Sequence, residues 1–266
     1  MEKSYGVNNQ TQINNEIDSY LEELKINGFS VISNVLTDKE LNNSREKLDE
    51  VYEIQKNKIG EEHLLLINEK NTVRCPLIYD DFFLTIARKE IVLNIIEKIL
   101  GSYFILHLQN GIINKPNREH HQSSWHRDLP YQNFVITNPL AVSALYCIDD
   151  FTKESGSTFV LPFSHNVVTI PSNNYVDKYK KQLIAKAGSV ILFDSMLFHK
   201  AGYNVSAFTR RAINNVYSTP ILKQQIDLKE ALKGKFSDDE KVSKFLGYHS
   251  NSADNDFDWR IKRVKR

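Results

Sequence analysis

The stretch Ser124-Trp125-His126-Arg127-Asp128-Leu129-Pro130 places a histidine and a carboxylate two positions apart in the chain. In an extended segment, side chains alternate between the two faces, so His126 and Asp128 project from the same face. An imidazole nitrogen and a carboxylate oxygen placed in this way can share one metal ion. The pattern by itself is weak, because a surface histidine beside an acidic turn produces the same letters. A metal site therefore requires a third ligand from elsewhere in the chain.

His199 is the candidate third ligand, in the segment Ser195-Met196-Leu197-Phe198-His199-Lys200, which follows a strong strand signal. Two histidines and one carboxylate on one side of an ion leave adjacent positions open, which is the arrangement of non-haem Fe(II) oxygenases. Arg210 follows eleven positions later, on the next predicted strand. An arginine suits an acid-binding site, because its planar guanidinium grips a carboxylate through two parallel hydrogen bonds.

The composition is that of an ordinary globular protein, with 266 residues, 41% hydrophobic and 25% charged residues and a net charge of +1. A charge this close to zero does not recruit nucleic acid or an anionic membrane, so we expect neither as a partner. The two cysteines, Cys75 and Cys147, lie beside apolar residues and are predicted to be buried free thiols. The polar start of the chain lacks a signal-peptide core, and no apolar run is long enough to cross a bilayer. We therefore expect a cytoplasmic protein.

The first hundred residues show mainly helical patterns. Thr37 and Glu40 form a capping box, and Leu36 and Leu41 form a hydrophobic staple, so a helix is predicted over residues 37–58. Apolar spacing and helix-ending glycines predict the other elements. These are a disordered tail at 1–12, helices at 13–26, 80–87 and 89–100, and strands at 29–33 and 63–67.

From residue 103 onwards short β-type runs alternate with Pro, Gly, Asn and Ser. The runs are 103–108, 110–114, 141–148, 158–161, 167–170, 189–193 and 211–217. Many short strands without repeated helical connections indicate a mainly β fold with flanking helices, a sandwich or jelly roll. Strands of two facing sheets would bring the ligands at 126 and 199 to one cavity. We predict one domain over 1–266, with mainly helical support at 13–101, a jelly-roll core at 102–220 and a polar C-terminal extension at 221–266, helical near 226–246.

Four motifs in the same order resemble the phytanoyl-CoA dioxygenase family of oxygenases. Residues 125–131 resemble its iron-binding segment, and Ile113-Asn114-Lys115-Pro116 looks like the strand end before it. Residues 154–165 are similar to the family's connection that ends Pro-Gly-Ser-His. Residues 199–204, followed by Thr209-Arg210-Arg211-Ala212, look like its distal histidine and its cosubstrate arginine.

The resemblance implies an Fe(II)- and 2-oxoglutarate-dependent dioxygenase on a double-stranded β-helix, the cupin-like jelly roll. His126, Asp128 and His199 would hold the iron, and Arg210 would bind the far carboxylate of 2-oxoglutarate. Dioxygen would be the second cosubstrate, and the products would include succinate and CO2. If the strand register slips by one residue, Arg211 takes the role of Arg210. Because Asp128 is present where halogenating relatives carry a small residue, hydroxylation of a small molecule is the predicted reaction.

Further candidates lie around these residues. Asn110 stands on the strand before the iron-binding turn, where relatives place a polar side chain against 2-oxoglutarate. Asn214 faces inward together with Arg210 by alternation, and Trp125 and Tyr131 flank the ligands, so all three are candidates for substrate contact. Arg74 is another, although a surface salt bridge explains it better than a role in the pocket does. Trp125 is also explained by packing at the barrel mouth.

Two positions depart from the family pattern. The loop after the distal histidine reads His199-Lys200-Ala201-Gly202, without the usual serine that helps to hold 2-oxoglutarate. Phe163 replaces the glycine of Pro-Gly-Ser-His. Two other functions remain open: a non-redox cupin-type metalloenzyme, such as an isomerase or lyase using zinc or manganese, and an inactive small-molecule-binding protein. No pattern indicates the substrate or the oligomeric state.

Overall fold

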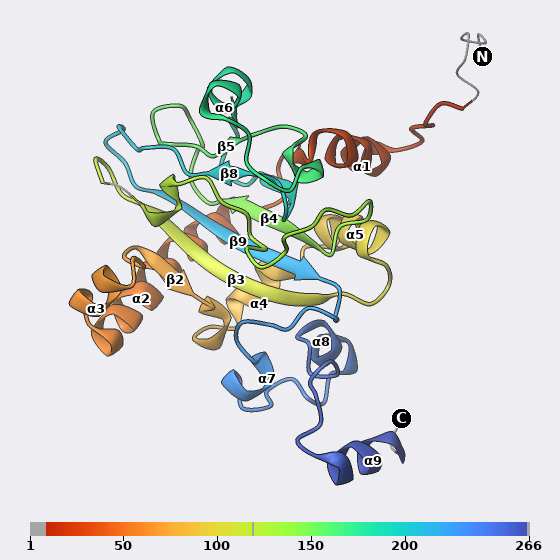
Figure 1. Cartoon of the computed structure of the whole chain (residues 1–266). Helices are drawn as coiled ribbons and strands as arrows, with labels where there is room; N and C mark the ends of the chain where they lie inside the picture. The colour runs from red at the N-terminus through yellow and green to blue at the C-terminus, as the bar shows by residue number, and fades with distance from the viewer. Residues whose placement is uncertain (1–8, 119, 265–266) are drawn as a thin grey trace.

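The structure is a computed structural model that describes residues 9–118 and 120–264. Its centre is a pair of antiparallel sheets (Figure 1). The six-stranded sheet has the order β1-β7-β4-β9-β3-β2, and the three-stranded sheet has the order β6-β5-β8. The strands are β1 Phe29–Ile32, β2 Thr72–Arg74, β3 Ile105–Asn114, β4 Ala141–Cys147, β5 Phe159–Val160, β6 Lys181–Gln182, β7 Val190–Asp194, β8 His199–Lys200 and β9 Arg210–Ser218.

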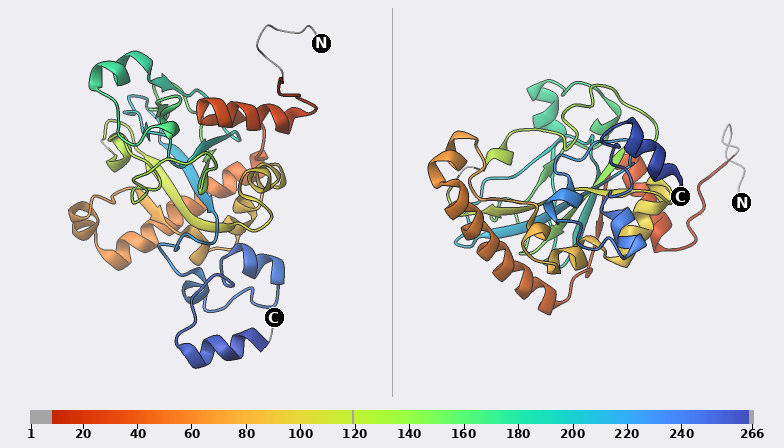
Figure 2. Two further views of the ribbon diagram at one scale, coloured as in Figure 1. Left: turned by 45° about the vertical axis from the view of Figure 1, so that its right-hand side comes forward. Right: turned by 90° about the horizontal axis from the view of Figure 1, so that it is seen from below.

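Helices cover one face of the six-stranded sheet, and the smaller sheet with α6 lies on the other side (Figure 2). The α-helices are α1 Glu16–Asn27, α2 Asp38–Ile59, α3 Glu61–Leu66, α4 Phe82–Ala87, α5 Glu90–Leu100, α6 Asn173–Tyr179, α7 Leu228–Ala231, α8 Glu240–Phe245 and α9 Asp256–Val264. Three short 3-10 helices are η1 Pro76–Ile78, η2 His121–Ser123 and η3 Ser164–Asn166. No helix within the described residues is both long and apolar enough to span a membrane.

The two faces of the large sheet carry different side chains because strand residues alternate. The helix-covered face contributes Ile213 and Tyr217 of β9 to the largest hydrophobic cluster, together with Leu48 and Val51 of α2. The opposite face contributes Ala212 and other side chains to a second, smaller cluster that includes Val160 of the small sheet. The space between the two sheets is therefore only partly filled by apolar residues. We call the side of the six-stranded sheet that borders this space the inner face. Polar side chains of β3, β4 and β9 also point there.

Local signals determine the ends of several helices. Thr37 and Glu40 form the predicted capping box at the start of α2, with both hydrogen bonds present. Gly28 lies at the end of α1 with φ of 86° and donates its N–H to the Leu24 carbonyl, as expected for a left-handed helix end. The helices predicted at 80–87 and 89–100 are confirmed as α4 and α5.

Several predicted elements are wrong. The run 63–67 is not a strand: it lies largely within α3, where Leu64 is buried while Leu65 and Leu66 are exposed, so no strand alternation exists. The β-branched run 167–170 pairs with no strand, and the carbonyls of Val167 and Val168 accept hydrogen bonds from Arg127 instead. The helix predicted near 226–246 is two short helices, α7 and α8.

The boundaries of the predicted β core also change. The runs 103–108 and 110–114 form one strand, β3, with an irregularity between Leu106 and Leu108. The large sheet takes β1 and β2 from the region that we predicted to be mainly helical support. The predicted tail 1–12 falls largely on residues 1–8, which lie outside the described residues.

Candidate metal centre

The segment around His126 lies antiparallel to the segment around His199. The backbone N–H of His126 donates to the His199 carbonyl at 3.0 Å, and the reverse hydrogen bond is 3.1 Å long. Two residues along, the N–H of Asp128 donates to the Ser195 carbonyl at 3.0 Å. On its other side His199 pairs with Val160 of β5. Residues 73 positions apart in the chain are therefore held together by backbone hydrogen bonds.

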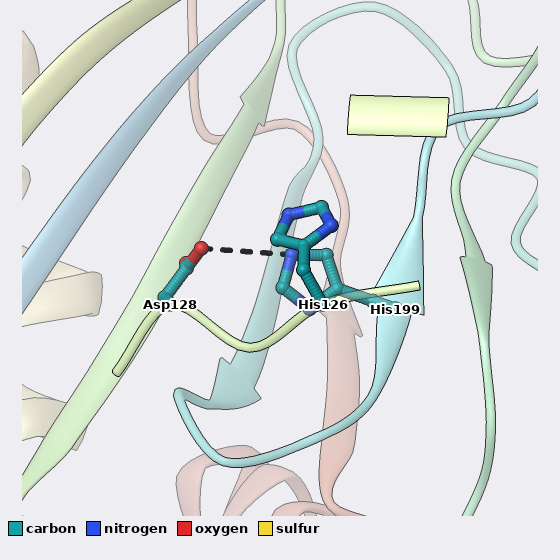
Figure 3. Close-up of side chains that lie close together, drawn as sticks. All are labelled: His126, Asp128 and His199. Carbon is teal, nitrogen blue, oxygen red and sulfur yellow. Dashed lines mark ion pairs between the residues drawn. The ribbon is translucent and has the colours of Figure 1, made fainter. Parts of the chain in front are cut away.

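The three predicted ligands meet in space. His126, Asp128 and His199 each offer one ligand atom, and these atoms all lie within 4.8 Å of one another. The Nε2 atom of His199 is 3.6 Å from Oδ1 of Asp128, and Figure 3 shows the two imidazole rings beside the carboxylate. A single ion between them would have two nitrogen ligands and one oxygen ligand.

Both imidazoles are held in the same tautomer. Nδ1 of His126 lies 2.8 Å from the Ser124 carbonyl, and Nδ1 of His199 lies 3.0 Å from the Leu197 carbonyl. A carbonyl only accepts hydrogen bonds, so Nδ1 carries the proton in each ring and Nε2 presents a lone pair. The Nε2 atom of His126 is buried and has no hydrogen-bond partner among the residues described. Such an outer hydrogen bond on each histidine is typical of metal ligands.

Asp128 is oriented by two side chains of the large sheet. Ser143 of β4 donates to its Oδ2 at 2.6 Å, and Asn214 of β9 donates to the same oxygen at 2.9 Å. Ser143 also contacts the hydroxyl of Ser195 at 2.8 Å. Because both donors take Oδ2, Oδ1 is left to face the histidines. Asn214, predicted as a substrate contact, therefore lies beside the carboxylate ligand.

The protonation states suit a metal ion. Burial would raise the pKa of Asp128, but His199, His126 and the two hydrogen bonds outweigh burial and lower it. Burial and the neighbouring His126 lower the pKa of His199 to about 4. At neutral pH the site thus holds a carboxylate and a neutral His199, the forms that bind metals. This donor set fits the two-histidine, one-carboxylate arrangement of non-haem Fe(II) sites.

Arg127 fixes the metal-binding segment to its surroundings. Its guanidinium donates to the main-chain carbonyls of Met196 at 2.7 Å, Val168 at 2.6 Å and Ser164 at 3.2 Å, and also to Val167. The same group lies 3.8 Å from the ring centroid of Phe198. Since Arg127 stands between the two nearby ligands, these contacts determine where the ligand backbone lies.

Arg210, and not Arg211, lies on the inner face of the large sheet. Only 1% of Arg210 is exposed, and its Nε donates to the Ser155 carbonyl at 3.2 Å. Its guanidinium lies 4.4 Å from the ring centroid of Phe151, and its Nη2 has no hydrogen-bond partner among the described residues. Burial lowers the pKa of Arg210 to about 10. Arg211 points to the helix side and forms ion pairs with Asp49 and Asp149.

A narrow cavity of about 20 Å³ joins Arg210 to the metal site. Its lining includes His199, Arg210 and Asn214, with Gln122 and Thr158 as further polar residues. The cavity admits no more than a water molecule. A larger acid can enter only if side chains such as Gln122 turn aside.

Asn110 and Arg74 contact each other, and neither is among the residues that line this cavity. With its amide oriented to satisfy both neighbours, Asn110 accepts from Nη1 of Arg74 at 2.8 Å and donates to the Gln109 carbonyl at 2.8 Å. Arg74 also forms an ion pair with Glu69. The structure therefore gives no contact between either residue and the metal ligands, and their predicted roles stay predictions.

Trp125 and Tyr131 differ in their surroundings. Trp125 packs against the small cluster of Leu161, Val176 and Phe198. Tyr131 is 90% exposed and lines a second cavity, which Asp128 also lines. The packing interpretation thus accounts for Trp125, whereas Tyr131 stands at an opening next to the metal site.

In the two segments that depart from the family pattern, the backbone at one position in each favours glycine. Phe163 adopts a left-handed conformation with φ of 66°, which a glycine adopts without strain. Gly202 lies against the loop before β5, and a Cβ atom there would be 2.7 Å from the Ser157 carbonyl oxygen. A glycine is therefore required at 202 for the loop after His199 to pack in this way.

Sequence analysis missed Ser143, Ser195 and Arg127 as supports of the ligands. A signal for Ser143 was present, because it is a polar residue in the middle of the apolar run Ala141–Cys147. Arg127 carries no such signal, since an arginine beside a metal ligand looks like a solvated side chain.

The comparisons with known proteins agree with this site. The sequence profile of the phytanoyl-CoA dioxygenase family matches residues 24–212. The uncharacterized protein Rv1501 of Mycobacterium tuberculosis is 32% identical over 250 residues, 91% of this chain and 90% of that protein. The ectoine dioxygenase of Nocardia farcinica is 25% identical over 225 residues, 72% of this chain and 74% of that protein.

The fold also has a counterpart among solved structures. The non-haem α-ketoglutarate-dependent epimerase SnoN from nogalamycin biosynthesis aligns with a TM-score of 0.58 and 18% identity, over 77% of this chain and 83% of that one. SnoN in complex with Fe3+, α-ketoglutarate and nogalamycin RO gives a TM-score of 0.59 at 15% identity, over 77% and 84%. The family match, which spans most of the chain, confirms the resemblance stated from the four motifs: the chain belongs to the phytanoyl-CoA dioxygenase family.

Proposed function

We propose that this protein is an Fe(II)- and 2-oxoglutarate-dependent oxygenase that hydroxylates a small molecule, on a double-stranded β-helix formed by its two sheets. His126 and His199 would bind the ion through Nε2, and Asp128 through Oδ1. Each of these atoms is turned toward the others by a hydrogen bond at the opposite end of its group. Family membership and the likeness to α-ketoglutarate-dependent SnoN support the same assignment.

The observation that carries the proposal is the state of Arg210. A buried guanidinium without a carboxylate partner is costly, and native proteins pair such charges. Within the described residues, Arg210 forms no ion pair, and its unpaired Nη2 belongs to a residue lining the same cavity as His199. The missing partner would be the distal carboxylate of 2-oxoglutarate, whose other end would reach the ion.

Iron chelated by 2-oxoglutarate supplies the oxidising chemistry, in which dioxygen is consumed, succinate and CO2 are released and a substrate C–H bond is hydroxylated. The protein's own residues do the rest. Ser143 and Asn214 keep Asp128 from turning away, the Leu197 and Ser124 carbonyls fix the imidazole tautomers, and Arg127 holds the ligand backbone. Arg210 would orient the acid by two hydrogen bonds.

A non-redox metalloenzyme is the less suitable assignment, because it has no use for a buried arginine that lines the same cavity as His199. The likeness to an epimerase has a different consequence. Because SnoN is an epimerase, a product other than an alcohol is the second candidate outcome. Mass spectrometry of the product under 18O2 would decide between the two outcomes.

The test is an anaerobic titration of the purified chain with Fe(II) and 2-oxoglutarate, followed by admission of air and measurement of succinate. We expect one iron per chain, the visible charge-transfer band of the chelate, and slow succinate formation without substrate. Asp128→Ala is expected to lose all three. Asp150→Ala, an exposed carboxylate paired with Lys186, is the matched control and should keep them. Iron uptake and succinate formation by Asp128→Ala at the wild-type level would contradict the assignment.

A further inference from the structure

The irregularity in β3 places an additional side chain on the inner face. Leu106 pairs with Tyr217 of β9, and Leu108 pairs with Val216. Two residues that are two positions apart on β3 therefore pair with neighbouring residues of β9, whereas in a regular ladder their partners would also be two positions apart. His107 is the extra residue of this β-bulge. Bulges occur next to active sites, where they redirect a side chain. Without the bulge, His107 and Leu108 would lie on opposite faces of the sheet.

The ring of His107 is buried but only half satisfied. The residue is 7% exposed, and its Nδ1 lies 3.3 Å from the hydroxyl of Ser218, an inner-face residue of β9. No other hydrogen bond to the ring occurs among the residues that the structure describes, so Nε2 has no protein partner. Burial lowers the pKa of His107, which keeps the imidazole neutral at pH 7. A neutral ring offers one donor and one acceptor.

His107 and the metal ligand Asp128 line the same cavity, which has a volume of about 280 Å³. This volume is close to the lower end of small-molecule sites. Most of the lining is apolar and includes Leu129, Tyr131, Phe134 and Leu222. Among the other polar residues of the lining, Lys223 and Gln225 are exposed. Gln132 is half-buried: its amide donates to the Phe134 carbonyl, and its Oε1 is buried without a partner among the described residues. As a whole residue, His107 is therefore the most buried polar residue of a mainly apolar cavity that reaches the candidate metal site.

We propose that this cavity binds the substrate, and that the substrate is a compact apolar molecule whose single hydroxyl or carbonyl group hydrogen bonds to Nε2 of His107. This inference rests on the proposed function, because Asp128 places the cavity beside the ion. The hydrogen bond fixes which C–H bond of the molecule lies toward the metal centre. Compounds of the same shape without an oxygen atom would lose that contact and leave the imidazole unpaired.

The test uses two probes of one shape, 1-indanol and indane, in ligand-observed NMR titrations of the full chain with Zn(II) and 2-oxoglutarate. Wild type is expected to bind 1-indanol about tenfold more tightly than indane, the net effect of one hydrogen bond to a buried group. In His107→Leu the preference should fall below about twofold, since the hydrogen bond is lost. In His107→Gln, which keeps a donor and an acceptor, part of the preference for 1-indanol should return. His63→Leu makes the same change at an exposed histidine of α3 and should keep the full preference.

Two results would overturn the proposal: no binding of either probe to wild type, or an unchanged preference in His107→Leu. If His107→Leu does not fold, Ser218→Ala decides, because it removes the hydroxyl that positions the ring. We then expect the preference for 1-indanol over indane to fall about threefold, because the hydrogen bond is weakened but not removed. An unchanged preference would contradict the inference. Failure of the proposed function is read separately, from the Fe(II) titration of wild type. Probe binding is measured whether or not iron binds.

Discussion

Three unpaired polar atoms on the inner face identify the residues that need a ligand. Nε2 of His126, Nη2 of Arg210 and Oδ1 of Asn214 are buried without hydrogen-bond partners among the described residues. Each such atom costs about 1–3 kcal/mol if it stays unpaired. All three belong to residues at or beside the metal ligands. Their cost is compensated if a metal ion, an acid and water fill the space between them.

Arg210→Ala is expected to raise the concentration of 2-oxoglutarate needed for half-maximal succinate formation by roughly 100-fold. The loss is about 3 kcal/mol, the size expected when one partner of a buried charged pair is removed. Arg211→Ala is the control, because its ion pairs with Asp49 and Asp149 lie on the helix side. It should reduce thermal stability without changing the 2-oxoglutarate requirement. An unchanged requirement in Arg210→Ala would exclude this arginine as the acid-binding group.

Ser143→Ala should weaken Fe(II) binding by about 10- to 100-fold, the usual effect of removing a hydrogen bond that orients a metal ligand. Without the hydroxyl, Oδ2 of Asp128 keeps only its contact with Asn214, and the carboxylate can rotate. Ser44→Ala is the matched control, since Ser44 is also fully buried but its hydroxyl has no partner. Competition titrations with a chromogenic chelator measure both affinities. Equal affinities would show that Ser143 does not position the ligand.

His120 makes stability depend on pH. It is buried, and burial followed by the neighbouring His121 lowers its pKa to about 3. In the unfolded chain the imidazole titrates near its ordinary pKa of about 6.5. Between these values the unfolded state binds the extra proton, so folding stability rises with pH and is lost as the pH falls below about 6.5.

Chemical denaturation at pH 7 and pH 5 measures this effect. His120→Asn removes one titrating group, and the free energy of unfolding should then decrease less between the two pH values, by up to about 1.4 kcal/mol per pH unit. His249→Asn, a change at an exposed histidine after α8, is the comparison. The same pH dependence in His120→Asn and wild type would refute the assignment.

At the level of elements, two of the short segments that build the candidate metal site lie outside the strands. The ligand segment 126–128 has one bridge to His199, and the connection 163–170 has no strand partner. Arg127 joins both segments and the turn before His199 through main-chain carbonyls. One side chain therefore replaces the hydrogen bonds that a sheet would have supplied.

Arg127→Met should loosen these segments together. We expect a loss of about 2 kcal/mol in stability, the scale of a hydrogen bond to a charged group, and faster proteolysis within 163–170. Arg88→Met, at an exposed arginine after α4, should show neither effect. Urea denaturation measures the stability, and limited chymotrypsin digestion, which can cleave after Phe163, measures the proteolysis. Wild-type proteolysis in Arg127→Met would mean that other contacts hold the connection.

At the scale of the whole molecule, the C-terminal region divides into a packed part and an exposed part. Leu228, Phe245 and Leu246 belong to the largest hydrophobic cluster, and Gln224 donates to the Leu106 carbonyl at 2.6 Å. The following helix α9 lies beyond α7 and α8 in Figure 1, and Phe257 and Trp259 on it are exposed. The region 224–248 is therefore part of the folded core.

Two truncations test this division. Removing residues 254–266 should change the midpoint of thermal unfolding by no more than a few degrees, because none of the described side chains of α9 belongs to the main cluster. Removing residues 226–266 exposes several buried side chains, each worth about 1.5–3 kcal/mol, and should prevent stable folding. Circular dichroism melts of the two truncated chains measure the difference. Equal melting temperatures of the two truncated chains would show that α7 and α8 do not contribute to the stability of the core.

The sequence by itself determined the elements whose signals are local. The capping box of α2 and the glycine at the end of α1 involve residues three to five positions apart, so they are readable without a partner. The grouping of His126, Asp128 and His199 was predictable too, because four motifs in order indicated the family, and the family motif indicates these residue types. Hydrogen bonds between residues that are close in sequence can form regardless of how the rest of the chain packs.

The tertiary structure decided which side chains face the metal. The choice between Arg210 and Arg211 depends on strand register, since a slip of one residue exchanges the two faces. The roles of Ser143 and Arg127, and the bulge that turns His107 inward, arise from contacts with residues 15 or more positions away. The leucine run 63–67 lies in α3 because no strand lies beside it to complete a ladder. Such contacts have no signature in a single stretch of chain, because their energy exists only after distant segments have met.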